Sequence, residues 1–185
     1  MNIVVFVSGN GTTLQSIIDS IDSRELHSEI VLVVSSNDKA YGLERARQAD
    51  IDTYVIKNSD PSEMDEELLQ ILDNYDVDLI VLAGYLKMIG KKLIDRYSII
   101  NTHPSLLPKF GGKGMYGMNI HRAVIEAKEE YSGATVHYVD DKCDEGKIIK
   151  QTKLKILPDD TAETLSQKIQ EIEKRQLIEI LKEFE

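Results

Sequence analysis

Short apolar segments alternate with amphipathic ones along the first half of the chain. The apolar segments are rich in β-branched residues, and the early ones lack polar alternation, as do strands that are covered on both faces. They span residues 3–7, 30–34, 53–56, 79–83 and 98–101. Apolar residues recur at helical spacing between them, within residues 14–21, 43–49, 68–72 and 91–97. This alternation predicts an α/β fold built on a doubly wound, mostly parallel, Rossmann-like sheet.

The second half of the chain has a less regular pattern. Glycines and prolines between residues 104 and 117 predict a long connection that is followed by a helix. Residues 135–139 and 148–156 are expected to form strands, and the polar alternation of the second predicts an exposed antiparallel edge. Asp160 followed by Glu163 predicts the capped start of a long C-terminal helix.

The composition fits one domain that spans residues 1–185, because 42% of the residues are hydrophobic and supply a single core. The only cysteine, Cys143, has no partner for an intramolecular disulfide, which indicates a reducing compartment. The first apolar run is much shorter than the roughly 20 residues that cross a bilayer, and no basic segment precedes it. We therefore expect a cytoplasmic protein with no membrane partner.

The charge of the chain is unevenly distributed. Its 22 basic and 32 acidic residues give a net charge of -10, which disfavours nucleic acid as a partner. Residues 60–78 hold eight acidic residues and no basic one, on a helix that is expected to be solvated. Residues 87–113 hold six basic residues and one acidic one, which leaves a local charge of +5. Small anionic ligands are therefore expected near this second segment.

A glycine-rich segment, Ser-Gly-Asn-Gly-Thr-Thr-Leu at residues 8–14, joins the first strand to the first helix. Unpaired backbone N–H groups and the positive end of the helix dipole make such a junction an anion site, with phosphate as the natural ligand. An ordinary glycine-rich turn is the alternative. The third glycine of a dinucleotide fingerprint and the Gly-Lys-Ser/Thr ending of a P-loop are both missing, which disfavours NAD and P-loop nucleotides.

The most informative segment is Asn-Thr-His-Pro-Ser-Leu-Leu-Pro at residues 101–108. Residues two apart on a strand face the same way, so Asn101 and His103 are expected to project together at the end of the fifth strand. Open α/β sheets bind their ligands at this edge. Pro104 favours extended geometry at His103, and an amide beside an imidazole suits the stabilisation of an oxyanion. A structural histidine bonded to a backbone carbonyl is the alternative.

An acidic turn at residues 140–146 lies between the last two strands. By itself it reads as a solvated loop, but beside His103 one of its carboxylates would raise the pKa of the imidazole and accept protons through water. The spacing does not select the carboxylate.

The other histidines and the methionines have weaker roles in this prediction. We expect His27 to be exposed and His137 to have a supporting position near the site. We expect His121 to lie on a helix surface, with a position at the mouth of the glycine-rich connection as the alternative. Methionines 88, 115 and 118 are expected to pack, with contact to a flat aromatic ligand as the alternative. The sequence contains no Gly-x-Ser-x-Gly and no His-Glu-x-x-His motif, which favours a metal-free site that uses general acid and electrostatic catalysis.

Five segments in the same order resemble the folate-dependent phosphoribosylglycinamide formyltransferases of purine synthesis. They are residues 8–15 (SGNGTTLQ), 41–46 (YGLERA), 82–86 (LAGYL), 101–108 (NTHPSLLP) and 133–137 (GATVH). The resemblance covers nearly the whole chain. It implies transfer of a formyl group from 10-formyltetrahydrofolate to the amine of glycinamide ribonucleotide, with no metal.

The resemblance also implies roles for individual residues. His103 matches the catalytic proton donor, Asn101 the group that binds the formyl oxygen, and Asp144 the carboxylate that raises the histidine pKa and relays protons. The ribonucleotide contacts match Gly11, Thr12, Thr13, Gln170 and Glu173. The formyl-folate contacts match Leu86, Lys87, Met88, Ile89, Asn101, Asp140, Asp141, Lys142, Cys143 and Asp144.

The sequence departs from the family at the folate glutamate tail, because no arginine lies between Arg47 and Arg96. Lys57 and Lys87 are the candidate substitutes. The glycines of residues 111–117 indicate either a mobile lid or a fixed loop, and a cis bond is expected at Leu107-Pro108.

Two other functional classes stay open on the sequence alone. One is a different formyl enzyme, such as a formyltetrahydrofolate hydrolase or another folate-dependent N-formyltransferase. The second is a noncatalytic module that binds folate or a phosphoribosyl group. The sequence predicts small-molecule substrates in each case, and is compatible with a monomer or a homodimer.

Overall fold

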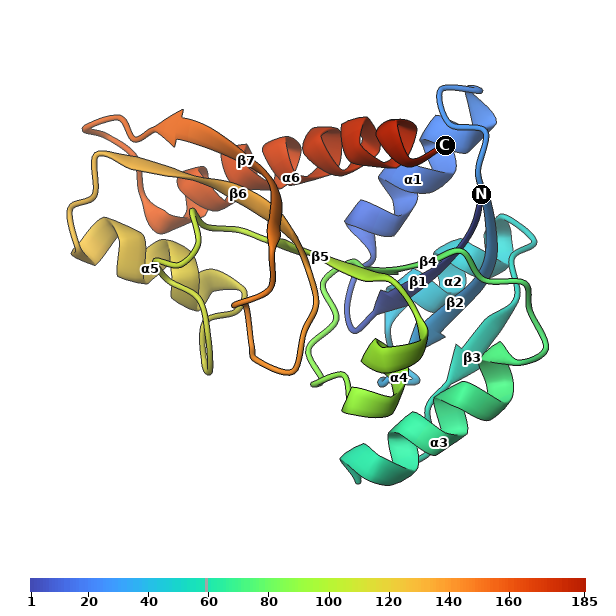
Figure 1. The fold of residues 1–185 in the computed structure, drawn as a ribbon. Coiled ribbons are helices and arrows are strands. Elements are labelled where there is room, and N and C mark those ends of the chain that lie inside the picture. The colour runs from blue at the N-terminus through green and yellow to red at the C-terminus, as the bar shows by residue number, and fades with distance from the viewer. Residues whose placement is uncertain (59) are drawn as a thin grey trace.

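A computed structural model of the protein describes residues 1–58 and 60–185 and contains a seven-stranded sheet (Figure 1). The strands lie in the order β3-β2-β1-β4-β5-β6-β7. They are β1 (Asn2–Val7), β2 (Glu29–Ser35), β3 (Thr53–Val55), β4 (Leu79–Leu82), β5 (Ile99–His103), β6 (Tyr131–Tyr138) and β7 (Ile148–Lys155). Strands β1 to β5 pair in parallel, whereas β6 and β7 are antiparallel. The predicted mostly parallel sheet with an antiparallel C-terminal edge is confirmed.

Helices cover both faces of this sheet (Figure 1). They are α1 (Thr12–Asp22), α2 (Tyr41–Gln48), α3 (Pro61–Leu72), α4 (Lys91–Arg96), α5 (Met118–Glu126) and α6 (Ala162–Phe184). Alternate residues of β1 face opposite sides: Val5 packs in a cluster with α1, α2 and α6, and Val4 in a cluster with α3 and α4. Because β1 is buried on both sides, its sequence is continuously apolar, as predicted. A third cluster joins α5 and α6 to β6.

Several element boundaries differ from the prediction, and two of the differences have a clear physical cause. Strand β6 begins at Tyr131, four residues before the predicted start, because Gly133 and Ala134 extend the pairing with β7. Helix α6 is capped by Thr161 and not by Asp160: the Thr161 hydroxyl accepts from the Thr164 N–H, and the Thr164 hydroxyl accepts from the Thr161 N–H. The capping box was therefore predicted one residue too early.

The acidic segment at residues 60–78 is not simply solvated, as the sequence suggested. Asp65 on α3 is only 4% exposed and accepts hydrogen bonds from the backbone N–H groups of Gly90 and Lys92, at the start of α4. Glu66 pairs with the Lys92 side chain at 2.7 Å, and Asp73 pairs with Arg96. The acidic helix therefore holds α4, which carries part of the predicted basic segment, against the sheet.

The topology places several loops at one edge of the sheet. Strand β1 continues into α1, whereas its neighbour β4 continues to α4 on the opposite face, so the chain leaves these strands in different directions. A crevice forms at such a switch point, beyond the carboxyl ends of the strands. The expected cis bond at Leu107-Pro108 is present. No helix in the described part of the chain is long and apolar enough to cross a membrane.

Candidate active site

A cavity of about 710 Å³ lies at the carboxyl ends of β1, β4 and β5. Four segments supply most of its walls, at residues 9–13, 82–89, 101–104 and 112–118. Further side chains come from α6 and from the loop after β6. The fold therefore brings together the glycine-rich loop, the Asn101–His103 pair and the acidic turn that the sequence singled out separately.

The glycine-rich loop presents an uncapped helix N-terminus to this cavity. Gly11 precedes α1 with φ 72° and no side chain caps the first turn of the helix. A Cβ on Gly11 would lie 2.6 Å from the Cα of Gly42, so both the backbone conformation and the close approach require glycine. Gly11, Thr12 and Thr13 all line the cavity, as predicted. Their backbone can therefore hold an anion through N–H groups and the helix dipole.

Arg45 braces this loop from α2. Its Nε donates to the Asn10 carbonyl at 2.8 Å, its Nη2 donates to Asn10 Oδ1 at 3.0 Å, and its Nη1 donates to Gln15 Oε1 at 3.0 Å. The guanidinium also lies 4.9 Å from the centre of the Tyr41 ring. All of these partners are neutral, so the arginine keeps its positive charge available beside the anion site.

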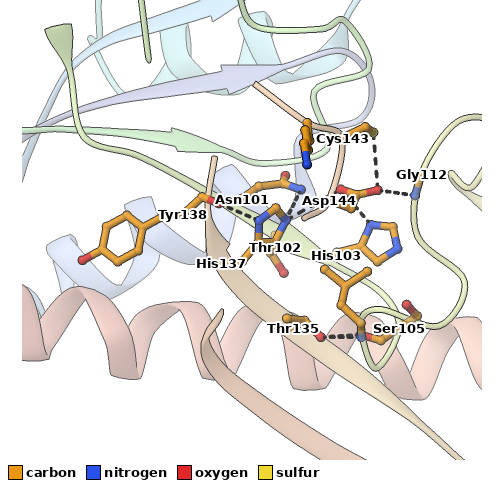
Figure 2. Close-up of polar contacts among 12 residues, drawn as sticks. Asn101, Thr102, His103, Ser105, Gly112, Thr135, His137, Tyr138, Cys143 and Asp144 are labelled. Carbon is orange, nitrogen blue, oxygen red and sulfur yellow. Dashed lines mark hydrogen bonds and ion pairs between the residues drawn. The ribbon is translucent and has the colours of Figure 1, made fainter. Parts of the chain in front are cut away.

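Asn101 and His103 lie on β5, opposite His137 and Thr135 of β6, as Figure 2 shows. Asn101 Nδ2 is 3.2 Å from His137 Nε2, and His103 Nδ1 is 3.6 Å from Asp144 Oδ1. His103 and His137 are nearly fully buried, at 4% and 1% exposure. Asn101, His103 and His137 all line the cavity, so the structure places the three residues close together, as the sequence predicted.

A backbone carbonyl sets the tautomer of His103. Nε2 is 2.8 Å from the carbonyl oxygen of Phe110, which only accepts, so Nε2 carries a proton. In the neutral ring the lone pair is then on Nδ1, which faces Asp144. Burial lowers the pKa of His103, and the opposing effects of Asp144 and the Phe110 carbonyl are smaller. The expectation of a raised pKa is therefore wrong here, although Asp144 acts in the expected direction.

Asp144 is held as an ionised carboxylate. Its Oδ2 accepts from the Gly112 N–H at 2.9 Å, and its Oδ1 is 3.7 Å from His137 Nε2. Burial raises the pKa of Asp144, but His137 and His103 in their protonated forms, together with the Gly112 N–H, outweigh burial and hold it at about 2. Asp144 also has a positive φ of 58°. Of the carboxylates in the acidic turn, this one faces both histidines.

The polar groups of α6 form the far wall of the site. Glu173 Oε1 accepts from the hydroxyl of Thr102 at 3.1 Å, and Gln170 also lines the cavity. Burial raises the pKa of Glu173 to about 7, and the Thr102 hydrogen bond only partly opposes it. A ligand that binds here thus meets a carboxyl group close to its titration point and a neighbouring amide.

The opposite wall is apolar and open to solvent. Leu86, Met88 and Tyr116 line the cavity and are 62%, 56% and 55% exposed, respectively. Large apolar side chains left exposed at a cavity mouth favour a flat apolar ligand over simple packing. Lys87, Ile89, Asp140, Lys142 and Cys143 also line the cavity, whereas Asp141 is exposed and does not.

The remaining histidine predictions have mixed outcomes. His27 is exposed, as expected. The expected place of His121 on a helix surface is wrong, and the alternative fits: His121 is 3% exposed and lines the cavity. The apolar face of α5, with Ile120 and Val124, turns inward and carries His121 with it. Methionines 88, 115 and 118 all line the cavity. Met115 also packs against the third hydrophobic cluster, as expected, whereas Met88 is 56% exposed.

Sequence reasoning missed three contributors to the site. They are the Phe110 carbonyl, the Gly112 N–H and the Thr102 hydroxyl. The Phe110 carbonyl and the Gly112 N–H are backbone groups, so the residue types at these positions do not reveal them. Thr102 could have been found from the sequence. It lies between two predicted site residues on a strand, so its side chain points to the other face of the sheet, which a helix was expected to cover.

Most of the predicted basic segment is neutralised by ion pairs. Lys91, Lys92, Arg96 and Lys109 pair with Asp95, Glu66, Asp73 and Glu129, respectively. Within residues 1–58 and 60–185, no ion pair forms at Lys87 or Lys113, and both line the cavity. The positive charge that remains is therefore located where an anionic ligand would enter.

Fold and site together define a doubly wound α/β protein with a cavity at the switch point of its sheet, lined by a helix N-terminus and an Asn–His–Asp cluster. Comparison with known proteins identifies the group within this class. A model of the formyl transferase family matches residues 1–181, and the chain belongs to this family.

Three relatives within this family are all named phosphoribosylglycinamide formyltransferase. The chain is 42% identical to the phosphoribosylglycinamide formyltransferase of Haemophilus influenzae, over 92% of this chain and 81% of that protein. It is 36% identical to the chloroplastic phosphoribosylglycinamide formyltransferase of Arabidopsis thaliana, with 97% of this chain aligned, and it spans only 63% of that protein's length. The crystal structure of phosphoribosylglycinamide formyltransferase from Bacillus halodurans superimposes with a TM-score of 0.92 at 33% identity, covering 100% of this chain and 95% of that chain.

Proposed function

We propose that the protein transfers the formyl group of 10-formyltetrahydrofolate to the amine of glycinamide ribonucleotide, in purine biosynthesis. The observation that carries this proposal is the meeting of Asn101, His103 and Asp144 in one cavity with an uncapped helix N-terminus. The named relatives in bacteria and plants support the same activity. We further propose that residues 1–185 act as a single formyltransferase domain, in the cytoplasm, as a monomer or a homodimer.

The two ends of the cavity suit the two substrates. In this proposal the ribonucleotide phosphate binds at Gly11, Thr12 and Thr13, where Arg45 adds a positive charge. The ribose hydroxyls bind Gln170 and Glu173 on α6. The pterin ring of the formyl donor lies along residues 86–89, and the loop at residues 140–144 closes its other side.

The chemistry follows from the neutral state of His103. When the amine attacks the formyl carbon, the carbonyl oxygen gains negative charge, and the amide of Asn101 donates to it. The amine must lose a proton, and Nδ1 of His103 accepts it because that nitrogen carries the lone pair. The resulting imidazolium is stabilised by Asp144 at 3.6 Å. It then returns the proton to the folate nitrogen as the carbon–nitrogen bond to the formyl group breaks.

A formyl-transfer assay with purified protein tests the proposal. The assay contains 10-formyltetrahydrofolate with and without glycinamide ribonucleotide, and follows folate absorbance and formylated product. We expect turnover only when the amine is present. Hydrolysis without the amine would instead favour a formyltetrahydrofolate hydrolase, and ligand binding without turnover in either assay would favour a noncatalytic module.

Two variants assign the catalytic groups within this assay. His103→Ala and Asp144→Asn should each lower kcat roughly 10²- to 10³-fold, as removal of a stabilising group does at other oxyanion sites, and both should still bind the ribonucleotide. Asp159→Asn, at an exposed aspartate on another loop, serves as the matched control. A near-normal kcat in either site variant would remove that residue from the mechanism.

A further inference from the structure

His137 lies directly opposite Asn101 in the antiparallel pairing of β5 with β6. It is 1% exposed and lines the same cavity. Side chains of directly opposed residues in such a pair lie within contact distance on one face of the sheet. The imidazole therefore reaches Asn101 from a neighbouring strand, at a fixed register.

The hydrogen bonds of the ring determine what His137 offers to Asn101. Its Nδ1 is 2.8 Å from the carbonyl oxygen of Tyr138, and a carbonyl only accepts, so Nδ1 carries the proton. In the neutral ring Nε2 is then an acceptor. Two groups approach Nε2: Asn101 Nδ2 at 3.2 Å and Asp144 Oδ1 at 3.7 Å. The ionised carboxylate has no proton to donate, so Asn101 is the partner.

We infer that His137 is a positioning residue that selects the amide orientation of Asn101 for formyl transfer. An asparagine amide can turn about its last torsion and exchange its oxygen and nitrogen positions. The lone pair on Nε2 accepts one N–H of Nδ2 and repels the amide oxygen, so only one orientation is stabilised. The second N–H of Nδ2 is then free to donate to the formyl oxygen. This inference rests on the proposed function and adds a residue that does not itself touch the reacting atoms.

A substitution at His137 should therefore affect kcat more than substrate binding. We expect His137→Leu to lower kcat about 10-fold, with KM for either substrate changed by less than about 2-fold, because one buried hydrogen bond to Asn101 is lost. His137→Gln keeps an acceptor oxygen and should recover most of kcat. His27→Leu makes the same change at an exposed histidine outside the cavity and should leave kcat unchanged.

A double-mutant cycle tests whether His137 acts through Asn101. If it does, His137→Leu costs about 10-fold in kcat with Asn101 present and less than about 2-fold in the Asn101→Ala background. Equal losses in both backgrounds would overturn the inference, as would a His137→Gln variant no better than His137→Leu.

A measurement on the unmodified protein covers the case in which the His137 variants do not fold. Nitrogen-15 NMR of the histidine rings reports which nitrogen carries the proton. We expect the Nδ1–H tautomer for His137, and the Nε2–H tautomer would overturn the inference because Nε2 would then be a donor. This measurement needs no turnover. A wild-type protein without formyl transfer would contradict the proposed function, whereas the tautomer separately tests the contact between His137 and Asn101.

Discussion

Glu173 makes the stability of the protein depend on pH in a way that Glu173→Gln should remove. Its pKa is raised from 4.5 to about 7, first by burial, and the Thr102 hydrogen bond only partly offsets this effect. The folded protein therefore holds this proton more tightly than the unfolded chain does. Between pH 4.5 and pH 7 the folded state binds more protons, so the free energy of unfolding falls as the pH rises.

The size of this effect follows from the two pKa values. One pKa unit corresponds to about 1.36 kcal/mol. The titration curves of Glu173 in the folded and unfolded states together predict that the free energy of unfolding falls by roughly 2.5 kcal/mol between about pH 5 and pH 8. Glu173→Gln keeps an oxygen that accepts from Thr102 and has no charge to bury. Its stability relative to wild type should therefore increase by this amount over the same interval.

Urea unfolding at a series of pH values measures this difference. The free energies of unfolding of wild type and Glu173→Gln are subtracted at each pH, which cancels the titration of all other groups. Glu171→Gln makes the same change at an exposed position on the same helix and is the control. A constant or oppositely sloped difference for Glu173→Gln would refute the assigned burial of its carboxylate.

Three further predictions concern the remaining parts of the site. Gly11→Ala should cost about 1–3 kcal/mol and weaken ribonucleotide binding, since its φ is positive and a Cβ meets backbone, whereas Gly9→Ala, with open space at its Cβ, should keep its stability in thermal unfolding. Lys87→Ala should raise KM for a glutamate-bearing folate about two- to fivefold at low salt and less at high salt, and Lys57→Ala, which lies outside the cavity lining, should not. Because burial lowers the pKa of His103 and the ring must accept a proton, kcat/KM should fall on acidification with a midpoint below 6.5; a midpoint above that value would contradict the neutral His103.

The sheet could be predicted because burial on both faces leaves a direct trace in residue type. Strand β1 is apolar at every position from Ile3 to Val7, and the residues that end the parallel strands must share one edge. The position of Asn101 and His103 on the same face of β5 could be predicted because side chains two residues apart on a strand point the same way. The helix N-terminus at Gly11 followed from glycine at a strand-to-helix junction.

The features of the site that the sequence did not predict depend on contacts between distant segments. His121 was misplaced because it is a polar residue next to the apolar positions Ile120 and Val124, and the packing of α5 against α6 buries it together with them. The direction of the His103 pKa was misjudged because the sequence offered a nearby carboxylate but gave no measure of burial, which is the larger effect. Phe110 and Gly112 act through backbone groups, so their residue types say nothing about the hydrogen bonds that they make.

The net charge of -10 is compatible with the two proposed anionic substrates because acidic side chains neutralise only some of the cations. Ion pairs with acidic side chains neutralise Lys92 and Arg96, which lie on α4, outside the cavity lining. Arg45 is held by neutral oxygens and an aromatic ring, so the same interactions that order the anion loop leave its charge intact. Lys87 and Lys113 line the cavity, and no ion pair involves them in the described residues. The unpaired cations at one edge of the sheet therefore support the two anionic substrates proposed above, and the net negative charge of the chain does not argue against them.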